Sequence, residues 1–178
     1  LPVPTRSAET YLVRRDQQGV RFLTPLRHQD AAALGLTRPL DTPDLPAARA
    51  VLGERVSIDG VVARNMESDG LSFQIVHDLA VENSTFSDLR GNGIHPGSGS
   101  QRPVIRRNTV RRCGCGIGWC WGVKYGFAEE NLIEECEIGI SIGHRDTDNV
   151  MRRNTVRSSG RCGLFFREDP PARAAHRN

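Results

Sequence analysis

The residues best suited to chemistry lie at fixed distances after a recurring glycine–isoleucine or glycine–leucine pair. Counting five positions past the glycine gives Trp121, His144 and Glu168, while Asp146 lies seven positions past its glycine and Arg167 four. Imidazole and carboxyl groups act as general acids and bases, and an indole ring offers a flat apolar face for a sugar ring. If the segments stack in this register, an acid–base site lies beside an aromatic platform.

Basic side chains surround these positions, since Lys124 and Arg145 lie in the same segments. Such cations can neutralise the carboxylate of a uronate sugar. We therefore predict His144, Asp146 and Glu168 as acid–base residues, and Trp121, Lys124, Arg145 and Arg167 as substrate contacts. His95, two positions past its own glycine in an earlier segment, is a further predicted substrate contact.

Several reactions are compatible with this set of side chains. Paired carboxylates would permit glycoside hydrolysis. A base beside a cation that stabilises an oxyanion would instead permit lyase or epimerase chemistry on a uronate. A structural alternative also stands, in which Asp146 and Asp148 bond the backbone of a turn that contains His144.

The sequence predicts no metal or other cofactor. Asp146 and Asp148 could hold Ca²⁺ through oxygen ligands, but two carboxylates are fewer than such a site needs. The spacing of Cys113, Cys115 and Cys120 does not match the patterns of zinc sites. Cys113 and Cys136 are 23 residues apart in equivalent positions, so we expect two buried thiols there, with a disulfide as the alternative.

A repeat of about 23 residues positions all of these groups. Asn83, Asn108, Asn131 and Asn154 step by 25, 23 and 23 residues, and each is followed by a glycine with an apolar residue. The units contain short apolar runs separated by Gly, Asn and Ser, and none has the periodicity of a helix. Such units are stable only when stacked. This pattern predicts about five coils of a parallel β-helix, with the asparagines forming a ladder at a left-handed turn.

Charges support the same register. Arg106, Glu129 and Arg152 alternate in sign from one unit to the next, as do Arg111, Glu134 and Arg157. Opposite charges that meet across neighbouring strands stabilise a sheet by roughly 0.2–1 kcal/mol per pair. We therefore expect two ladders of ion pairs along the stack.

The chain divides into three predicted parts. Residues 1–53 form an N-terminal segment with a hairpin within residues 11–26 and a capping helix near residues 45–52. Residues 54–169 form the β-helix, and residues 170–178 are expected to be a loose tail. No capping signal follows residue 169, which favours a fragment of a longer protein.

Composition excludes some partners. The net charge of +3 arises from 24 basic and 21 acidic residues, so no large field of one sign would attract nucleic acid. No apolar run is long enough to predict a membrane span.

The units at 104–110 and 150–156, each followed by a Gly-Ile or Gly-Leu strand, resemble the bacterial right-handed parallel β-helix repeat proteins of the pectin-lyase-like superfamily. The resemblance covers residues 54–169 and implies an all-β fold, a polysaccharide or oligosaccharide substrate and a secreted or periplasmic location. The sequence has neither the paired-Asp and Arg-x-Lys pattern of polygalacturonases nor the Ca²⁺-site pattern of pectate lyases. Two functions follow: a glycosidase or polysaccharide lyase, or a non-catalytic module that binds glycans or serves in adhesion or structure.

Overall fold

The computed structural model describes residues 13–17, 19–23, 36–42 and 57–178. Contacts divide the chain into two compact units, residues 1–56 and 57–178. In the first unit, β1 (Val13–Asp16) and β2 (Gly19–Phe22) pair antiparallel, and β3 (Thr37–Arg38) pairs with β2. This pairing confirms the predicted hairpin. The predicted capping helix, at residues 45–52, lies outside the described residues.

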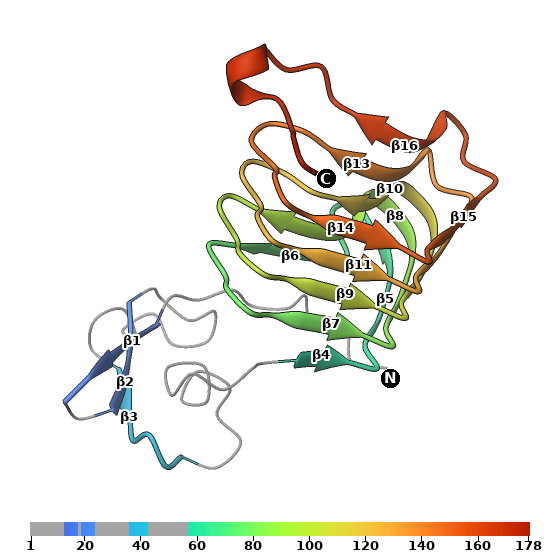
Figure 1. Ribbon diagram of the computed structural model, residues 1–178. Helices are drawn as coiled ribbons and strands as arrows, with labels where there is room; N and C mark the ends of the chain where they lie inside the picture. Colours follow the sequence, from blue (N-terminus) through green and yellow to red (C-terminus); the bar gives the residue numbers. More distant parts are fainter. Residues whose placement is uncertain (1–12, 18, 24–35, 43–56) are drawn as a thin grey trace, which may run out of the picture. The chain divides into compact units, whose positions relative to one another are not determined.

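The second unit is a parallel β-helix of five coils (Figure 1), which confirms the predicted all-β solenoid. The first coil contains β4 (Ser57–Asp59), β5 (Val62–Met66) and β6 (Leu71–Gln74), and the second contains β7 (Ala80–Glu82) and the long β8 (Thr85–Gly97). The third contains β9 (Val104–Arg106) and β10 (Thr109–Gly118), and the fourth β11 (Phe127–Glu129), β12 (Leu132–Glu134) and β13 (Ile138–Ile142). The fifth contains β14 (Val150–Arg152), β15 (Thr155–Arg157) and β16 (Cys162–Phe166).

The register of the stack follows the glycine–apolar pairs. Parallel pairing aligns the five apolar residues that follow the glycines, in the order Leu71, Ile94, Ile117, Ile140 and Leu164. The alignment used to predict the site is therefore correct. We call the outward side of β6, of the ends of β8 and β10, and of β13 and β16 the site face.

Close packing explains the glycine of each pair. A side chain at Gly93 would overlap Val110, and one at Gly116 would overlap Ile133 and the carbonyl of Gly139. Each glycine lies against buried side chains and backbone of the next coil, which leave no room for a Cβ atom. Glycine is thus required by the close packing of adjacent coils.

The asparagine ladder differs from the prediction in one member. Asn108, Asn131 and Asn154 stack as expected: Asn108 Nδ2 donates to Asn131 Oδ1 at 3.0 Å, and Asn131 Nδ2 donates to Asn154 Oδ1 at 2.9 Å. Ser84 rather than Asn83 continues the ladder, since its amide donates to Asn108 Oδ1 at 3.0 Å. The second and third coils are offset by 24 residues, so alignment on Asn83 was wrong by one position.

The left-handed residue of this turn also lies one position earlier than predicted. Asn83, Arg107, Glu130 and Arg153 have φ between 48° and 55°, while the ladder residues that follow them are not left-handed. The turn requires a left-handed residue, and the asparagine that follows this residue bonds the neighbouring coils through its carboxamide. In three coils a charged residue therefore adopts a conformation that favours Gly and Asn.

The ion-pair ladders are present with altered partners. In one ladder Glu134 lies between Arg111, at 2.6 Å, and Arg157. In the other, Glu129 pairs with Arg152 at 2.8 Å, whereas Arg106 pairs with Glu82 of the preceding coil at 2.5 Å. In this second ladder, the alternating charges therefore form separate ion pairs rather than a continuous series of them.

The C-terminal residues 170–178 make specific contacts and do not form the loose tail that we expected. After the 3-10 turn η2 (Pro171–Arg173), His176 bridges to Thr147 and Asn178 accepts hydrogen bonds from the amide and side chain of Asn149, each 3.0 Å. Arg177 forms an ion pair with Asp148 at 2.6 Å. Asn149 and Asn178 therefore form a second asparagine ladder, which holds the C-terminal residues in place although they lack an apolar pattern.

Candidate functional site

The most distinctive cluster on the site face contains Trp121, His144 and Asp169. The rings of Trp121 and His144 stack with centroids 5.0 Å apart and planes inclined by 33°. His144 Nδ1 lies 3.2 Å from Asp169 Oδ1, and the amide of His144 donates to Asp169 Oδ2 at 2.6 Å. The turn after the site-face strands holds these rings, because it aligns position 121 of the third coil with position 144 of the fourth.

Electrostatics keep the carboxyl group of this cluster ionised. The hydrogen bond from the His144 amide lowers the pKa of Asp169; burial opposes this effect, and the His144 ring adds to it. An ionised Asp169 holds the proton of His144 on Nδ1 and leaves Nε2 as the reactive nitrogen. The arrangement is that of a general base oriented by a carboxylate.

Backbone strain marks the same two residues. Trp121 has φ of 65° and His144 φ of 37°, and the same turn holds Ile75 and Ser98 in left-handed conformations. A tryptophan is unusual in this region of φ/ψ space. Its side chain gains little packing there, because Trp121 is 62% exposed. The residue type is therefore not explained by the core.

Asp146 and Arg167 are structural in this arrangement. Asp146 is fully buried, and its Oδ1 accepts from the amides of Gly122 and Val123, both at 2.9 Å. Its Oδ2 accepts from the Gly143 amide at 2.9 Å and from Arg167 at 3.1 Å. Burial raises the pKa of Asp146, although these donors oppose the effect. The carboxylate matches the structural alternative, in which it bonds the backbone of the turn.

The structure does not bring the other predicted residues into the cluster. Glu168 is exposed, and its neighbour Asp169 contacts His144 instead. Arg145 is exposed, with its amide bonded to the carbonyl of Arg173 at 2.6 Å, and Lys124 is half-buried at a backbone bridge to Thr147. The sequence analysis missed Asp169 because the residue aligned with His144 is Glu168, one position earlier.

A second histidine–aspartate pair lies on the same face. His95 Nδ1 is 2.5 Å from Asp69 Oδ2, and Asp69 Oδ1 accepts from the amide and side chain of Asn92 at 2.7 and 2.9 Å. Burial raises the pKa of Asp69, but the hydrogen bonds from Asn92 and His95 outweigh it and lower the value overall. Asp69 and Asn92 each precede the glycine of their coil, so counting backward from that glycine would have found them.

Metal ligands do not gather in the described residues, where no three His, Cys, Asp or Glu side chains converge. Asp146 and Asp148, considered above for Ca²⁺, have different partners, since Asp148 binds Arg177 through both oxygens at 2.6 and 2.8 Å. All five cysteines are free, and Cys113 and Cys136 are buried thiols as expected.

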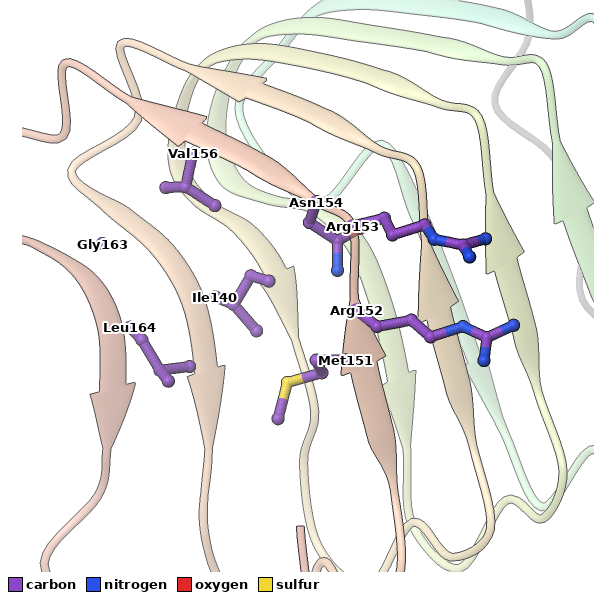
Figure 2. Close-up of a pocket in the computed structure, with 8 residues that line it drawn as sticks. All are labelled: Ile140, Met151, Arg152, Arg153, Asn154, Val156, Gly163 and Leu164. Atoms are coloured by element: carbon purple, nitrogen blue, oxygen red, sulfur yellow. The ribbon is translucent and has the colours of Figure 1, made fainter.

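A hollow of about 340 Å³ lies at the end of the stack and apart from these clusters (Figure 2). Its lining comes from Ile140, Met151, Arg152, Arg153, Asn154, Val156, Gly163 and Leu164. Leu164 is 51% exposed there, and Phe166 of the same strand is also 51% exposed. The hollow is the open end of the core, and none of the predicted site residues lines it.

Comparison with known proteins supports the fold. Within the described ranges, no helix is long and apolar enough to cross a membrane. Neither the curated proteins nor the solved structures that were searched include a match. The family model for a right-handed β-helix region matches residues 50–173, more than half of the chain. The chain therefore belongs to the family of right-handed β-helix proteins.

Proposed function

We propose that the protein is carbohydrate-active and acts on a polysaccharide, with Trp121 as a stacking platform and His144 as the acid–base residue. The observation that carries this proposal is the strained and exposed Trp121 ring stacked on a histidine that a carboxylate orients. Sugar rings bind to exposed aromatic faces through apolar contact, while histidine exchanges protons near neutral pH.

The available groups favour elimination over hydrolysis. Hydrolysis generally uses two carboxyl groups that face the glycosidic bond, and elimination needs one base beside a group that neutralises a uronate. Asp146 is engaged on both oxygens, which leaves the His144–Asp169 pair as the acid–base group of this cluster. Arg145, exposed and adjacent to His144 in the chain, is the cation that we propose for the uronate carboxylate. We therefore favour a polysaccharide lyase acting on a uronate polymer.

The test is product analysis with a panel of uronate-containing and neutral polysaccharides. His144→Asn is the informative variant, because its amide can retain the bond to Asp169 while the reactive Nε2 is lost. Glu168→Gln is the matched control, since it removes a neighbouring exposed carboxylate. We expect chain shortening with unsaturated ends in the wild type and in Glu168→Gln, and neither in His144→Asn.

Other outcomes would redirect the proposal. Shortening without unsaturated ends would indicate a hydrolase, and activity lost only in Glu168→Gln would move the acid–base role to Glu168. Binding that depends on Trp121 without any product would favour the glycan-binding module. No binding and no product with any polymer would overturn the proposal.

A further inference from the structure

The His95–Asp69 pair is built into an irregularity of the stack. Leu89 pairs with Cys113 but Asn92 pairs with Cys115, so β8 contains one extra residue relative to β10. Such bulges redirect side chains and occur often beside active sites. Here the bulge lies immediately before Asn92, the residue that holds Asp69.

Two neighbouring glycines make room for this polar cluster. A Cβ atom at Gly91 would overlap Asp69 Oδ1, and one at Gly118 would overlap Asn92 Oδ1. Neither glycine has a left-handed backbone, so conformation does not explain its presence. Two coils therefore lack a side chain next to an Asp–His pair whose own side chains are 20–22% exposed.

The remaining ring nitrogen of His95, Nε2, has no hydrogen-bond partner within residues 57–178. Asp69 engages Nδ1, and a Cβ atom placed on Gly97 would lie 3.7 Å from Nε2, at ordinary contact distance. The His95 side chain is 22% exposed. Because the ionised Asp69 keeps the proton on Nδ1, Nε2 is an acceptor, and its natural partner is a hydroxyl donor.

We propose that His95, oriented by Asp69 and Asn92, is a second carbohydrate-binding site on the site face, which accepts a hydroxyl of a sugar residue other than the one at Trp121. This inference rests on the proposed function. His95 lies two coils from His144 and three positions away along the strand, which gives a separation on the order of 14 Å at sheet spacings. That span exceeds one sugar ring, so the ligand is an oligosaccharide that bridges both histidines.

Isothermal titration with oligosaccharides of increasing length tests this site. The probes are oligogalacturonates from dimer to octamer, with cello-oligosaccharides of the same lengths as neutral counterparts. The variants are His95→Asn, which can keep the Asp69 bond and loses Nε2, and Trp121→Ala. We expect wild-type affinity to rise in a step once the chain reaches from Trp121 to His95. His95→Asn should weaken long chains roughly three- to tenfold, as one lost hydrogen bond implies, and leave short chains unchanged.

Each alternative outcome has a separate meaning. A step that survives in His95→Asn, or an equal loss for short and long chains, would overturn the second site while leaving the proposed function intact. No binding of any probe to the wild type would overturn both. Should His95→Asn fail to fold, the Nε2 signal of His95 in wild-type NMR spectra decides, because it must respond to long chains and not to short ones.

Discussion

Single polar residues determine how the coils meet. Asn131 is buried, and its side chain bonds both neighbouring coils. In the third coil, its Oδ1 accepts from the Asn108 amide at 3.0 Å and its Nδ2 donates to the carbonyl of Ile105 at 2.9 Å; in the fifth, its Nδ2 donates to Asn154 Oδ1 at 2.9 Å. Without the carboxamide, these backbone groups would be buried and unpaired, since Asn108 and Ile105 are both buried. The ladder therefore stabilises the stack chiefly by satisfying main-chain groups at each turn.

Replacing Asn131 by alanine should accordingly be costly. Each buried polar group left without a partner costs about 1–3 kcal/mol. The substitution leaves at least two backbone groups without their partner, so we expect the free energy of unfolding to fall by about 3 kcal/mol. Urea denaturation monitored by circular dichroism measures it. Asn83→Gly is the control: Asn83 is exposed and left-handed, which glycine tolerates, so its cost should stay below about 1 kcal/mol. If both variants lost the same free energy of unfolding, Asn83 would have to be counted as a member of the ladder.

The sequence predicted the coils but not every partner, and the reason lies at this same scale. Residue spacing fixes which positions align, so counting alone predicted that Trp121 and His144 lie in neighbouring coils at the same position. Spacing does not determine how far a side chain reaches. His144 bonds Asp169 instead of the aligned Glu168, and Asp146 turns inward to three amides. A one-residue bulge or offset, as at Asn83, is likewise invisible when every unit is assumed to have equal length.

At the scale of strands, the close approach of adjacent coils limits which side chains each position can hold. Gly116 faces Ile133 across the third and fourth coils, and Gly163 has the equivalent position in the fifth. The fifth coil has no coil beyond it in the structure, and a Cβ atom on Gly163 would lie 3.7 Å from Val156, at ordinary contact distance. The same position of the repeat is therefore tightly packed at Gly116 and has room for a side chain at Gly163.

Alanine at these two glycines should therefore have unequal effects. Gly116→Ala forces a methyl group into Ile133 and the backbone of Gly139, and overpacking of this kind costs about 1–3 kcal/mol. Gly163→Ala should be neutral within about 0.5 kcal/mol or slightly stabilising, since alanine restricts the unfolded chain. Thermal unfolding of both variants provides the comparison. A large loss in Gly163→Ala would mean that another segment covers the fifth coil.

The ion-pair ladder makes stability depend on pH. Burial raises the pKa of Glu134, but the hydrogen bond from Arg157 and the charges of Arg111 and Arg157 outweigh it and bring the value below the ordinary 4.5. A carboxyl group whose pKa is lowered by folding stabilises the folded state above its unfolded pKa, and this contribution disappears as pH falls through the folded pKa.

Glu134→Gln should therefore lower the urea midpoint at pH 7, and the gap to the wild type should narrow as pH falls below about 4.5. Denaturation curves at a series of pH values between 7 and 3 provide the measurement. Glu135→Gln is a control, because the Glu135 side chain is 59% exposed and lies 3.7 Å from its ion-pair partner Arg112. A gap that stays constant with pH would show that Glu134 acts through packing rather than charge.

For the β-helix as a whole, stability is a sum of contacts between adjacent coils. The middle coils are covered on both sides, and Ile117 and Ile133 are fully buried. The fifth coil is covered on one side: Leu164 is 51% exposed beside the hollow (Figure 2), and Phe166 of the same strand is equally exposed. Local opening should therefore begin at the fifth coil and proceed toward the middle.

Amide hydrogen exchange should reveal this gradient. Protection should be strongest in β9, β10, β11 and β12, because opening them breaks contacts with two neighbouring coils, and weaker in β14, β15 and β16. Trp121 and His144 project from turns of the third and fourth coils, so the site remains assembled while the end of the stack opens. The Leu164→Lys variant sharpens the test, since it should speed exchange in the fifth coil alone. Uniform protection across all coils would instead show that the β-helix unfolds as one cooperative unit, and Leu164→Lys would then speed exchange everywhere.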